Sequence, residues 1–129
     1  MDSMSWLEEL VLGIVRGDLP LSALKEAGVD FRIVGAPGEA RQIQITLKAP
    51  FTVAPKPVDL AKGLLAYRNR REQLRDWAAF VLGASELVDL APLDEWPEGD
   101  QLLNALWDAS FEGILKPDAE RVAIALANG

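Results

Sequence analysis

Carboxylates are the only potentially catalytic side chains that are numerous in this sequence. The chain has 20 Asp and Glu residues but neither His nor Cys, so it lacks an imidazole base, a thiolate nucleophile and the usual zinc ligands. Asp108 and Glu112 are four residues apart, with Asn104 one turn earlier. On a helix these side chains share a face, and their oxygens suit a hard cation such as Mg²⁺. We favour the alternative, a solvated polar face, because we identify no further ligand from another element.

Other catalytic motifs are absent from the sequence. Residues 35–38, Gly-Ala-Pro-Gly, are not followed by the Lys-Ser/Thr pair of a phosphate-binding loop. Ser85 and Ser110 lie in no nucleophile-elbow pattern. We therefore expect a protein that is not an enzyme and that holds neither a metal nor a cofactor. A carboxylate-based divalent-metal enzyme is the first alternative.

One acidic segment more than accounts for the net charge of -7. Between Asp76 and Leu115 there are nine acidic residues and no Lys or Arg, whereas the rest of the chain has 13 basic and 11 acidic residues. Such an uneven distribution of charge steers the approach of oppositely charged partners. Trp96 lies in this segment between Glu95 and Pro97, which is typical of an interface with a basic partner; the alternative is a hydrophobic staple on the helix that follows. The predicted partner-binding residues are Glu86, Asp89, Asp94, Glu95, Trp96, Glu98 and Asp100.

A basic stretch directly before this segment contains Arg68, Arg70, Arg71 and Arg75. On a helix, Arg68, Arg71 and Arg75 share a face on which Tyr67 can stack, a pattern suited to phosphates. Nucleic-acid-binding domains generally carry a net basic field, and this chain is acidic. We therefore predict no nucleic-acid partner and expect these arginines to pair with nearby acids.

The N-terminal half combines helices with one hairpin. A capping box at Ser5 and Glu8 predicts a helix over about 5–16, and a short helix carrying Leu21 and Leu24 follows. In residues 31–33 and 43–47, apolar residues occur at every second position. These two stretches flank a turn-rich loop, a pattern that predicts an antiparallel β-hairpin. Residues 51–53 are expected to add a short extended segment. Two strands alone are marginal in water, so the hairpin must pack on helices.

The C-terminal half is predicted to be helical. Apolar spacing favours one long or slightly broken helix over 58–83, because neither Pro nor Gly interrupts residues 64–82; the alternative is two helices that meet near Asn69. A connection with a turn of helix at 86–90 leads to a helix that begins at Pro97 and ends at Gly113. We expect Trp107 to lie in the core together with Trp77, because it belongs to the apolar stripe of this helix. The stripe consists of Leu102, Leu103, Leu106, Trp107 and Phe111. A last helix opens at Lys116 and Pro117 and buries Ala119, Val122, Ala123 and Leu126.

Together these elements predict an α+β fold, predominantly helical, with one small antiparallel β-hairpin packed on the helices. We expect a single domain over 1–129, with N-terminal helices in 1–28, the hairpin in 30–54 and a helical part in 57–129. Acidic residues precede the apolar run 10–15 and Arg16 follows it, the reverse of a signal peptide. No run approaches the roughly 18 apolar residues that span a bilayer. A cytoplasmic protein without membrane contact is predicted.

Two stretches carry a resemblance to a known family. Residues 75–80, Arg-Asp-Trp-Ala-Ala-Phe, and residues 97–108, which contain Leu-Leu-Asn-Ala-Leu, resemble small bacterial immunity proteins of the colicin and polymorphic-toxin type. In these proteins a helix with Trp-Ala precedes an acidic connection and a Leu-Leu-x-x-Leu helix. The resemblance covers the C-terminal half. It implies a non-catalytic inhibitor that occludes a basic toxin, often a nuclease, through Glu86, Asp89, Asp94, Glu95, Glu98 and Asp100.

The leading hypothesis is therefore a small acidic protein-binding module that recognises a basic protein. A second alternative, besides the metal enzyme, is an oligomer-forming accessory protein in which the hairpin edge or the 58–83 helix pairs between copies. The identity of the partner and the oligomeric state stay open at this stage.

Overall fold

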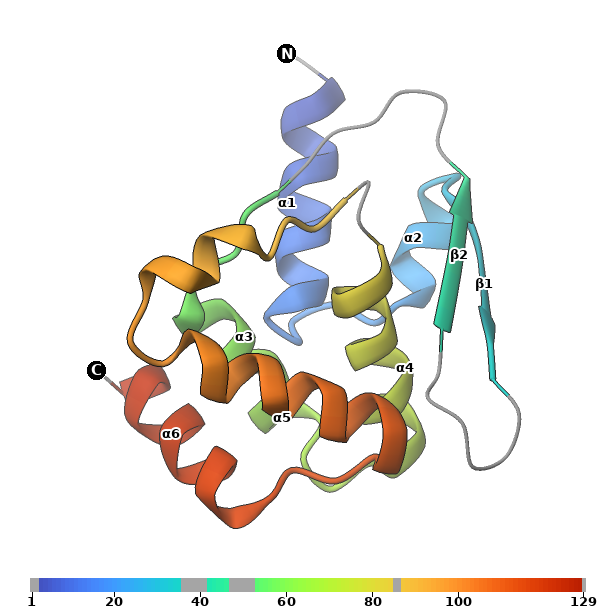
Figure 1. Cartoon of the computed structure of the whole chain (residues 1–129). Coiled ribbons are helices and arrows are strands. Elements are labelled where there is room, and N and C mark those ends of the chain that lie inside the picture. The colour runs from blue at the N-terminus through green and yellow to red at the C-terminus, as the bar shows by residue number, and fades with distance from the viewer. Residues whose placement is uncertain (1–2, 36–41, 47–52, 85–86, 129) are drawn as a thin grey trace.

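Helices make up most of the structure, and a two-stranded hairpin lies beside them (Figure 1). The computed structural model describes residues 3–35, 42–46, 53–84 and 87–128. The elements, in chain order, are α1 (Ser3–Val15), α2 (Ser22–Glu26), β1 (Asp30–Val34), β2 (Gln42–Thr46), α3 (Pro57–Ala66), α4 (Arg71–Gly83), the 3-10 helix η1 (Ala91–Glu95), α5 (Gly99–Glu112) and α6 (Pro117–Asn128). The predicted α+β class, predominantly helical with one packed hairpin, is confirmed.

The two N-terminal helices end at glycines with positive φ. Gly17 (φ +81°) follows α1, and Gly28 (φ +89°) follows α2. Glycine adopts this conformation without the penalty that a Cβ brings. Val11 and Val15 of α1 and Leu24 of α2 are fully buried, so both predicted helices are present and each buries an apolar residue.

The hairpin is held against the helices by its second strand. Phe31 pairs with Ile45 and Ile33 with Ile43 in an antiparallel register. Ile43 is buried and lies against Gly83, where an added Cβ would come within 2.9 Å of the Ile43 Cγ2 atom. This contact with α4 gives the two strands the support that they need.

A second extended contact joins the segment after the hairpin to the segment after α4. Val53 forms an isolated parallel bridge with Val88. Val53 donates its N–H to the Leu87 carbonyl (2.7 Å) and accepts from the Asp89 N–H (2.8 Å). Val53 is the one described residue of the extended segment predicted at 51–53, and this bridge agrees with that prediction; residues 51 and 52 lie outside the described residues.

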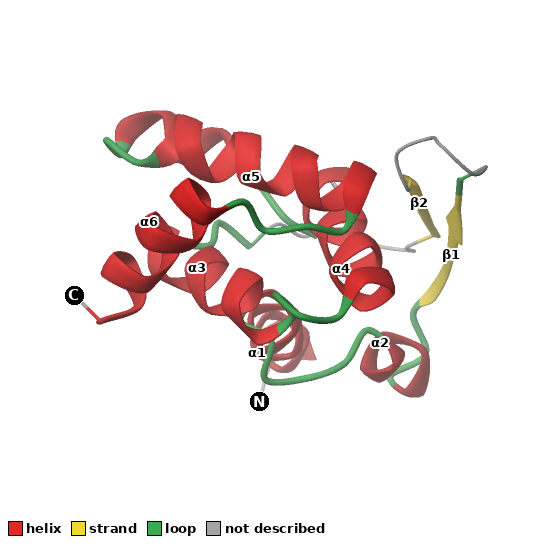
Figure 2. Cartoon of the chain, turned by 90° about the horizontal axis from the view of Figure 1, so that it is seen from below, coloured by secondary structure: helices red, strands yellow, loops and turns green. Residues whose placement is uncertain are grey.

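The favoured single helix over 58–83 is wrong, because two helices occupy this range. α3 ends before Tyr67 (φ -109°, ψ 9°) and α4 begins after Arg70 (φ -126°, ψ 86°), so the junction falls near Asn69, as in the alternative. α3 packs against α1 and α6, whereas α4 packs against α5 and β2 (Figures 1 and 2). The break lets each half bury its own apolar face, which one straight rod would not do.

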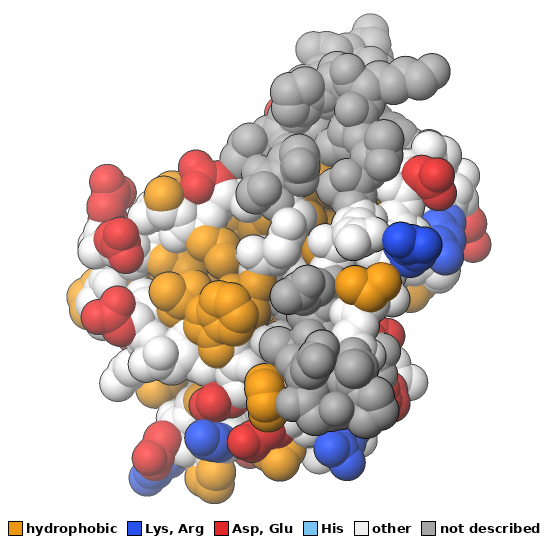
Figure 3. Space-filling view, turned by 45° about the vertical axis from the view of Figure 1, so that its right-hand side comes forward, with side chains coloured by type: hydrophobic (Ala, Val, Ile, Leu, Met, Phe, Trp, Pro, Cys, Tyr) orange, Lys and Arg blue, Asp and Glu red, His pale blue; other side chains and the backbone are white. Residues whose placement is uncertain are grey.

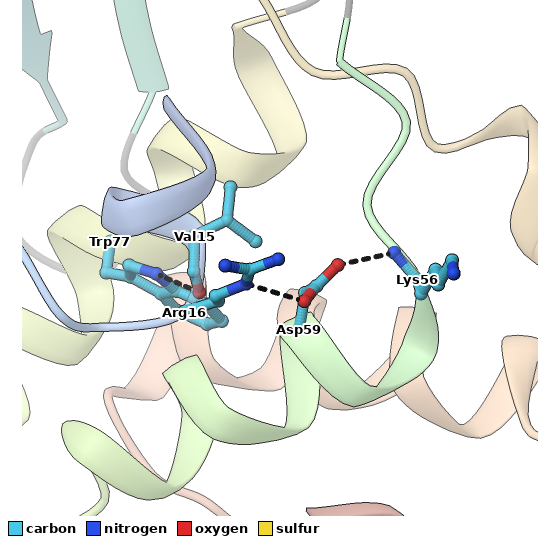
Figure 4. A network of polar contacts seen from close by, with 5 residues as sticks. All are labelled: Val15, Arg16, Lys56, Asp59 and Trp77. Atoms are coloured by element: carbon cyan, nitrogen blue, oxygen red, sulfur yellow. Dashed lines mark hydrogen bonds and ion pairs between the residues drawn. The ribbon is translucent and has the colours of Figure 1, made fainter. Parts of the chain in front are cut away.

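Trp77 joins α4 to the end of α1. Its indole N–H donates to the carbonyls of Ile14 (3.0 Å) and Val15 (3.2 Å), which the last turn of a helix leaves without partners in the helix itself. Beside it, Arg16 Nε donates to Asp59 Oδ1 at 2.8 Å, and Asp59 Oδ2 accepts from the Lys56 N–H at 2.9 Å (Figure 4). One carboxylate thus both caps α3 and ties α3 to α1.

The predicted start and stripe of α5 need correction. α5 begins at Gly99, and Pro97 lies in the preceding turn. Leu102 and Leu106 are buried as expected, but Trp107 and Phe111 are exposed. The buried face instead includes the small residues Ala105, Ala109 and Ser110, which let α5 lie close to α4, its main neighbour.

One further prediction is wrong and another holds only in part. The turn of helix expected at 86–90 is replaced by η1 at Ala91–Glu95, and Glu86 lies outside the described residues. α6 begins at Pro117, but only Ala123 is fully buried, while Ala119, Val122 and Leu126 are half-buried. α6 is an outer layer that covers α3 (Figure 2). None of the helices in the described ranges has the length and apolar character needed to cross a bilayer.

Candidate partner-binding surface

The predicted partner-binding residues 94–100 lie at the end of η1, in the turn that follows it and at the start of α5. Leu93 is buried and fixes this turn, because its carbonyl accepts the Trp96 N–H at 3.0 Å. The Trp96 carbonyl in turn accepts the Gly99 N–H at 3.1 Å. A Cβ on Gly99 would lie 2.0 Å from the Leu93 carbonyl oxygen. The glycine therefore lets α5 begin directly against η1, which turns the polar residues of this segment outward.

Most of the predicted site residues are exposed in this turn. Asp94, Glu95, Trp96 and Asp100 are exposed, and Glu98 is half-buried. Asp89 lies further back, where its Oδ1 accepts the Ala91 N–H at 3.0 Å. Glu86 lies outside the described residues. The structure thus gathers residues 94–100 at one end of α5 and leaves Asp89 as a turn cap.

Trp96 does not have the geometry of a hydrophobic staple. Its side chain is 45% exposed. The residue at the N-cap of α5 is Glu98, so the staple position directly before the cap belongs to Pro97. Trp96 is therefore partly exposed and lies one residue before the staple position.

Arg68, Arg71 and Arg75 each have a partner that lies outside residues 89–100. Arg68 pairs with Glu120 at 3.2 Å, Arg71 Nε donates to the Glu112 carbonyl at 3.2 Å, and Arg75 pairs with Glu72 at 3.6 Å. Among the residues that the structure describes, no Lys or Arg forms an ion pair with the carboxylates of residues 89–100. On the face shown in Figure 3, acidic side chains lie along one side of a hydrophobic area. Within the described ranges, the negative charge at this end of α5 is therefore not compensated by an ion pair.

Arg68, Arg71 and Arg75 do not form the shared face on which a phosphate-binding alternative would depend. Arg68 lies in the turn between the two helices that replace the single predicted one, while Arg71 and Arg75 belong to α4. Arg75 is buried and Arg71 is exposed. The three guanidinium groups therefore do not share the surface that a continuous helix would have given them.

The possible metal site on α5 gains no further ligand. Asp108 Oδ2 lies 3.3 Å from Lys116 Nζ, so its negative charge is already paired. Within the described part of the chain, no group of three potential metal-ligating acids comes together. Nothing in this arrangement favours a divalent-metal site at Asp108 and Glu112.

A second group of exposed apolar side chains lies on α5 and just after it, where the sequence predicted a buried stripe. Trp107, Phe111 and Ile114 are each half or more exposed. The large residues of the helix suggested one apolar stripe, whereas the core uses small ones at Ala105 and Ala109. The alternative pairing of Leu102 and Leu106 with these alanines was present in the sequence at equally good helical spacing.

No protein-family model, curated protein or solved structure matches this chain. Its function is therefore inferred from its own residues.

Proposed function

We propose that this chain is a small, non-catalytic, cytoplasmic protein-binding module that recognises a basic protein through residues 94–100. The observation that carries the proposal is the half-exposed Trp96 among carboxylates that no described Lys or Arg neutralises. An exposed indole next to free negative charge combines an apolar anchor with electrostatic attraction.

The two kinds of residue would contribute to different steps of binding. The carboxylates of Asp94, Glu95 and Glu98 would attract a cationic surface and raise the association rate, an effect that salt weakens. Trp96 would become buried at the centre of the interface and slow dissociation. An immunity-type inhibitor of a basic toxin, which the resemblance of the C-terminal half implies, is the narrower form of this proposal.

The test begins with affinity capture of partners from the native host, followed by kinetics with the purified partner. Trp96→Ala is expected to raise Kd by about 30-fold, the value of a hot spot of about 2 kcal/mol, mainly through faster dissociation. The double variant Asp94→Lys/Glu95→Lys is expected to lower the association rate and its dependence on ionic strength.

Two exposed residues elsewhere provide matched controls. Ile124→Ala removes an exposed apolar side chain on α6, and Asp18→Lys reverses a charge in the loop after α1. Both are expected to bind as the natural chain does. A partner whose association rate is the same at low and high salt, and whose affinity survives Trp96→Ala, would contradict the proposal.

A further inference from the structure

The outward face of α5 carries an apolar stripe separate from the surface around Trp96. Trp107 is 56% exposed, while Phe111 and Ile114 are each 50% exposed, and Leu103 lies half-buried one turn before Trp107. These three residues are half of the large apolar side chains that are exposed in the described chain. A contiguous exposed stripe of this kind marks an association surface.

The two ends of this stripe carry opposite charges. Asp100 is exposed at the N-terminal end of α5. At the other end, Arg71, Arg75, Phe111, Glu112 and Ile114 line an open cavity of about 350 Å³. Arg71 donates to the Glu112 carbonyl but, as far as the structure describes the chain, forms no ion pair with a carboxylate. The stripe therefore has the Asp100 carboxylate at one end and the Arg71 guanidinium at the other.

Residue spacing makes this face complementary to itself. Asp100 and Ile114 are each seven residues from Trp107, and Leu103 and Phe111 are each four residues from it. At a rise of about 1.5 Å per residue, the steps from Trp107 to Leu103 and to Phe111 are matched at about 6 Å, and Asp100 lies about 10 Å from Trp107. Ile114 follows Gly113, whose left-handed conformation ends α5. A two-fold axis at Trp107 would therefore place Leu103 opposite Phe111 of a second copy.

We propose that two copies of this chain associate through α5, antiparallel, with Trp107 at the two-fold axis. Asp100 of each copy enters the cavity of the other and pairs with Arg71 there, so that both ends of the contact are satisfied at once. The antiparallel arrangement also brings helix ends of opposite partial charge together. Such an isologous contact closes on itself and yields a dimer. Glu112 lines the same cavity and opposes the incoming carboxylate.

Sedimentation of the full chain over a range of concentrations tests this dimer. We expect a reversible monomer–dimer equilibrium that Trp107→Ala weakens by about tenfold or more. Ile124→Ala, which truncates an exposed apolar residue on α6, should leave the equilibrium unchanged. Glu112→Gln should strengthen the dimer, because it removes the opposing charge from the cavity. A monomer at all concentrations, or equal effects of the two alanine variants, would overturn the proposal.

A charge exchange tests the register of the contact. Asp100→Arg and Arg71→Asp are each expected to be monomeric, because each places like charges opposite one another twice in its own dimer. Mixed together, the two variants should form a heterodimer, since the introduced arginine of the first would face the introduced aspartate of the second at one end, and the natural pair would form at the other. The control is a mixture of Asp18→Arg with Arg71→Asp. It should not restore the ion pair at residue 71, because the introduced aspartate would still face Asp100 of the other copy. Failure of the mixture to associate would overturn the proposed register.

Asp100 belongs to both proposed surfaces, but their other residues differ, so the dimer and the binding of a basic partner can fail separately. Asp94→Lys/Glu95→Lys changes the partner surface but leaves the α5 stripe intact, so it is expected to dimerise normally. Trp107→Ala changes only the stripe and is expected to retain its association with the basic partner.

Discussion

Gly63 lies where α3 meets both the end of α1 and the indole of Trp77. An added Cβ would lie 2.1 Å from the Val15 carbonyl oxygen and 2.2 Å from the Trp77 Cζ2 atom. Neither neighbour is the flexible end of a side chain, because one is backbone and the other is a ring that two carbonyls hold by its N–H. This glycine is therefore needed for close packing.

Gly63→Ala is expected to lower the free energy of unfolding by about 2–4 kcal/mol, the cost of overpacking a core that cannot yield locally. Urea unfolding followed by tryptophan fluorescence measures it. Gly28→Ala is the comparison, because Gly28 has φ +89° but open space around it, and backbone strain alone should cost about 1 kcal/mol. Equal losses in the two variants would contradict the steric argument.

Tyr67, the only tyrosine of the chain, is expected to titrate late. Burial raises its pKa above the usual 10.0, and the nearby Arg70 guanidinium partly opposes this shift by lowering the pKa. Because the folded state holds the proton more tightly, the resulting stability is fully present below the unfolded pKa and is lost as the pH rises through the folded pKa. Tyrosinate absorbance should therefore appear at higher pH in the folded chain than in urea, and coincident titrations would disprove the shift. Tyr67→Phe should lack this alkaline loss of stability.

At the scale of elements, the two faces of α5 have separate roles. Leu106 is fully buried between helices, and the adjacent Trp107 is exposed. Leu106→Ala is expected to lower the free energy of unfolding by about 2–5 kcal/mol through a core cavity. Trp107→Ala should change it by less than about 1 kcal/mol when measured on the dilute monomer. Thermal or urea unfolding at low protein concentration distinguishes the two variants. A larger loss of unfolding free energy for Trp107→Ala than for Leu106→Ala would indicate that Trp107 lies in the core.

The α3–α4 junction illustrates why element boundaries were harder to predict than the elements themselves. Residues 67–70 contain neither Pro nor Gly, and their local spacing is compatible with helix. The two helices differ in their main neighbours, since α3 packs mainly on α6 and α1 and α4 mainly on α5 and β2. These neighbours are distant in sequence, so no local signal marks the junction.

At the scale of the whole molecule, the net charge of -7 and the carboxylates gathered at residues 94–100 produce repulsion within the folded chain. Raising sodium chloride from about 10 mM to about 200 mM should screen this repulsion and increase the melting temperature. Asp94→Asn/Glu95→Gln should show a higher melting temperature at low salt and a smaller response to salt. Calorimetry measures both, and a variant that is less stable than the natural chain would indicate that these acids support the fold instead of serving a partner.

The two proposed surfaces also fit together in one assembly. In an antiparallel dimer, the N-terminal ends of the two α5 helices point away from each other. Each copy would then present its own Asp94, Glu95 and Trp96 at one end of the dimer. A partner with two basic sites would gain affinity through the linkage of both contacts.

The sequence by itself determined the α+β class, the hairpin strands, the ends of the first two helices and the asymmetry of charge. These depend on local periodicity, turn residues and composition, which neighbours along the chain define. It also placed Asp94, Glu95, Trp96, Glu98 and Asp100 in one segment, because proximity along a short stretch ensures proximity in space.

Only the tertiary structure decided which of two equally periodic stripes of α5 faces the core, where the predicted 58–83 helix divides, and whether Arg68, Arg71 and Arg75 pair with the carboxylates of residues 89–100. Each of these depends on the space left by elements distant in sequence: small residues at Ala105 and Ala109 fit against α4, whereas Trp107 does not face inward. Periodicity restricts a residue to a face of its helix, but the packing of the other helices determines which face is buried.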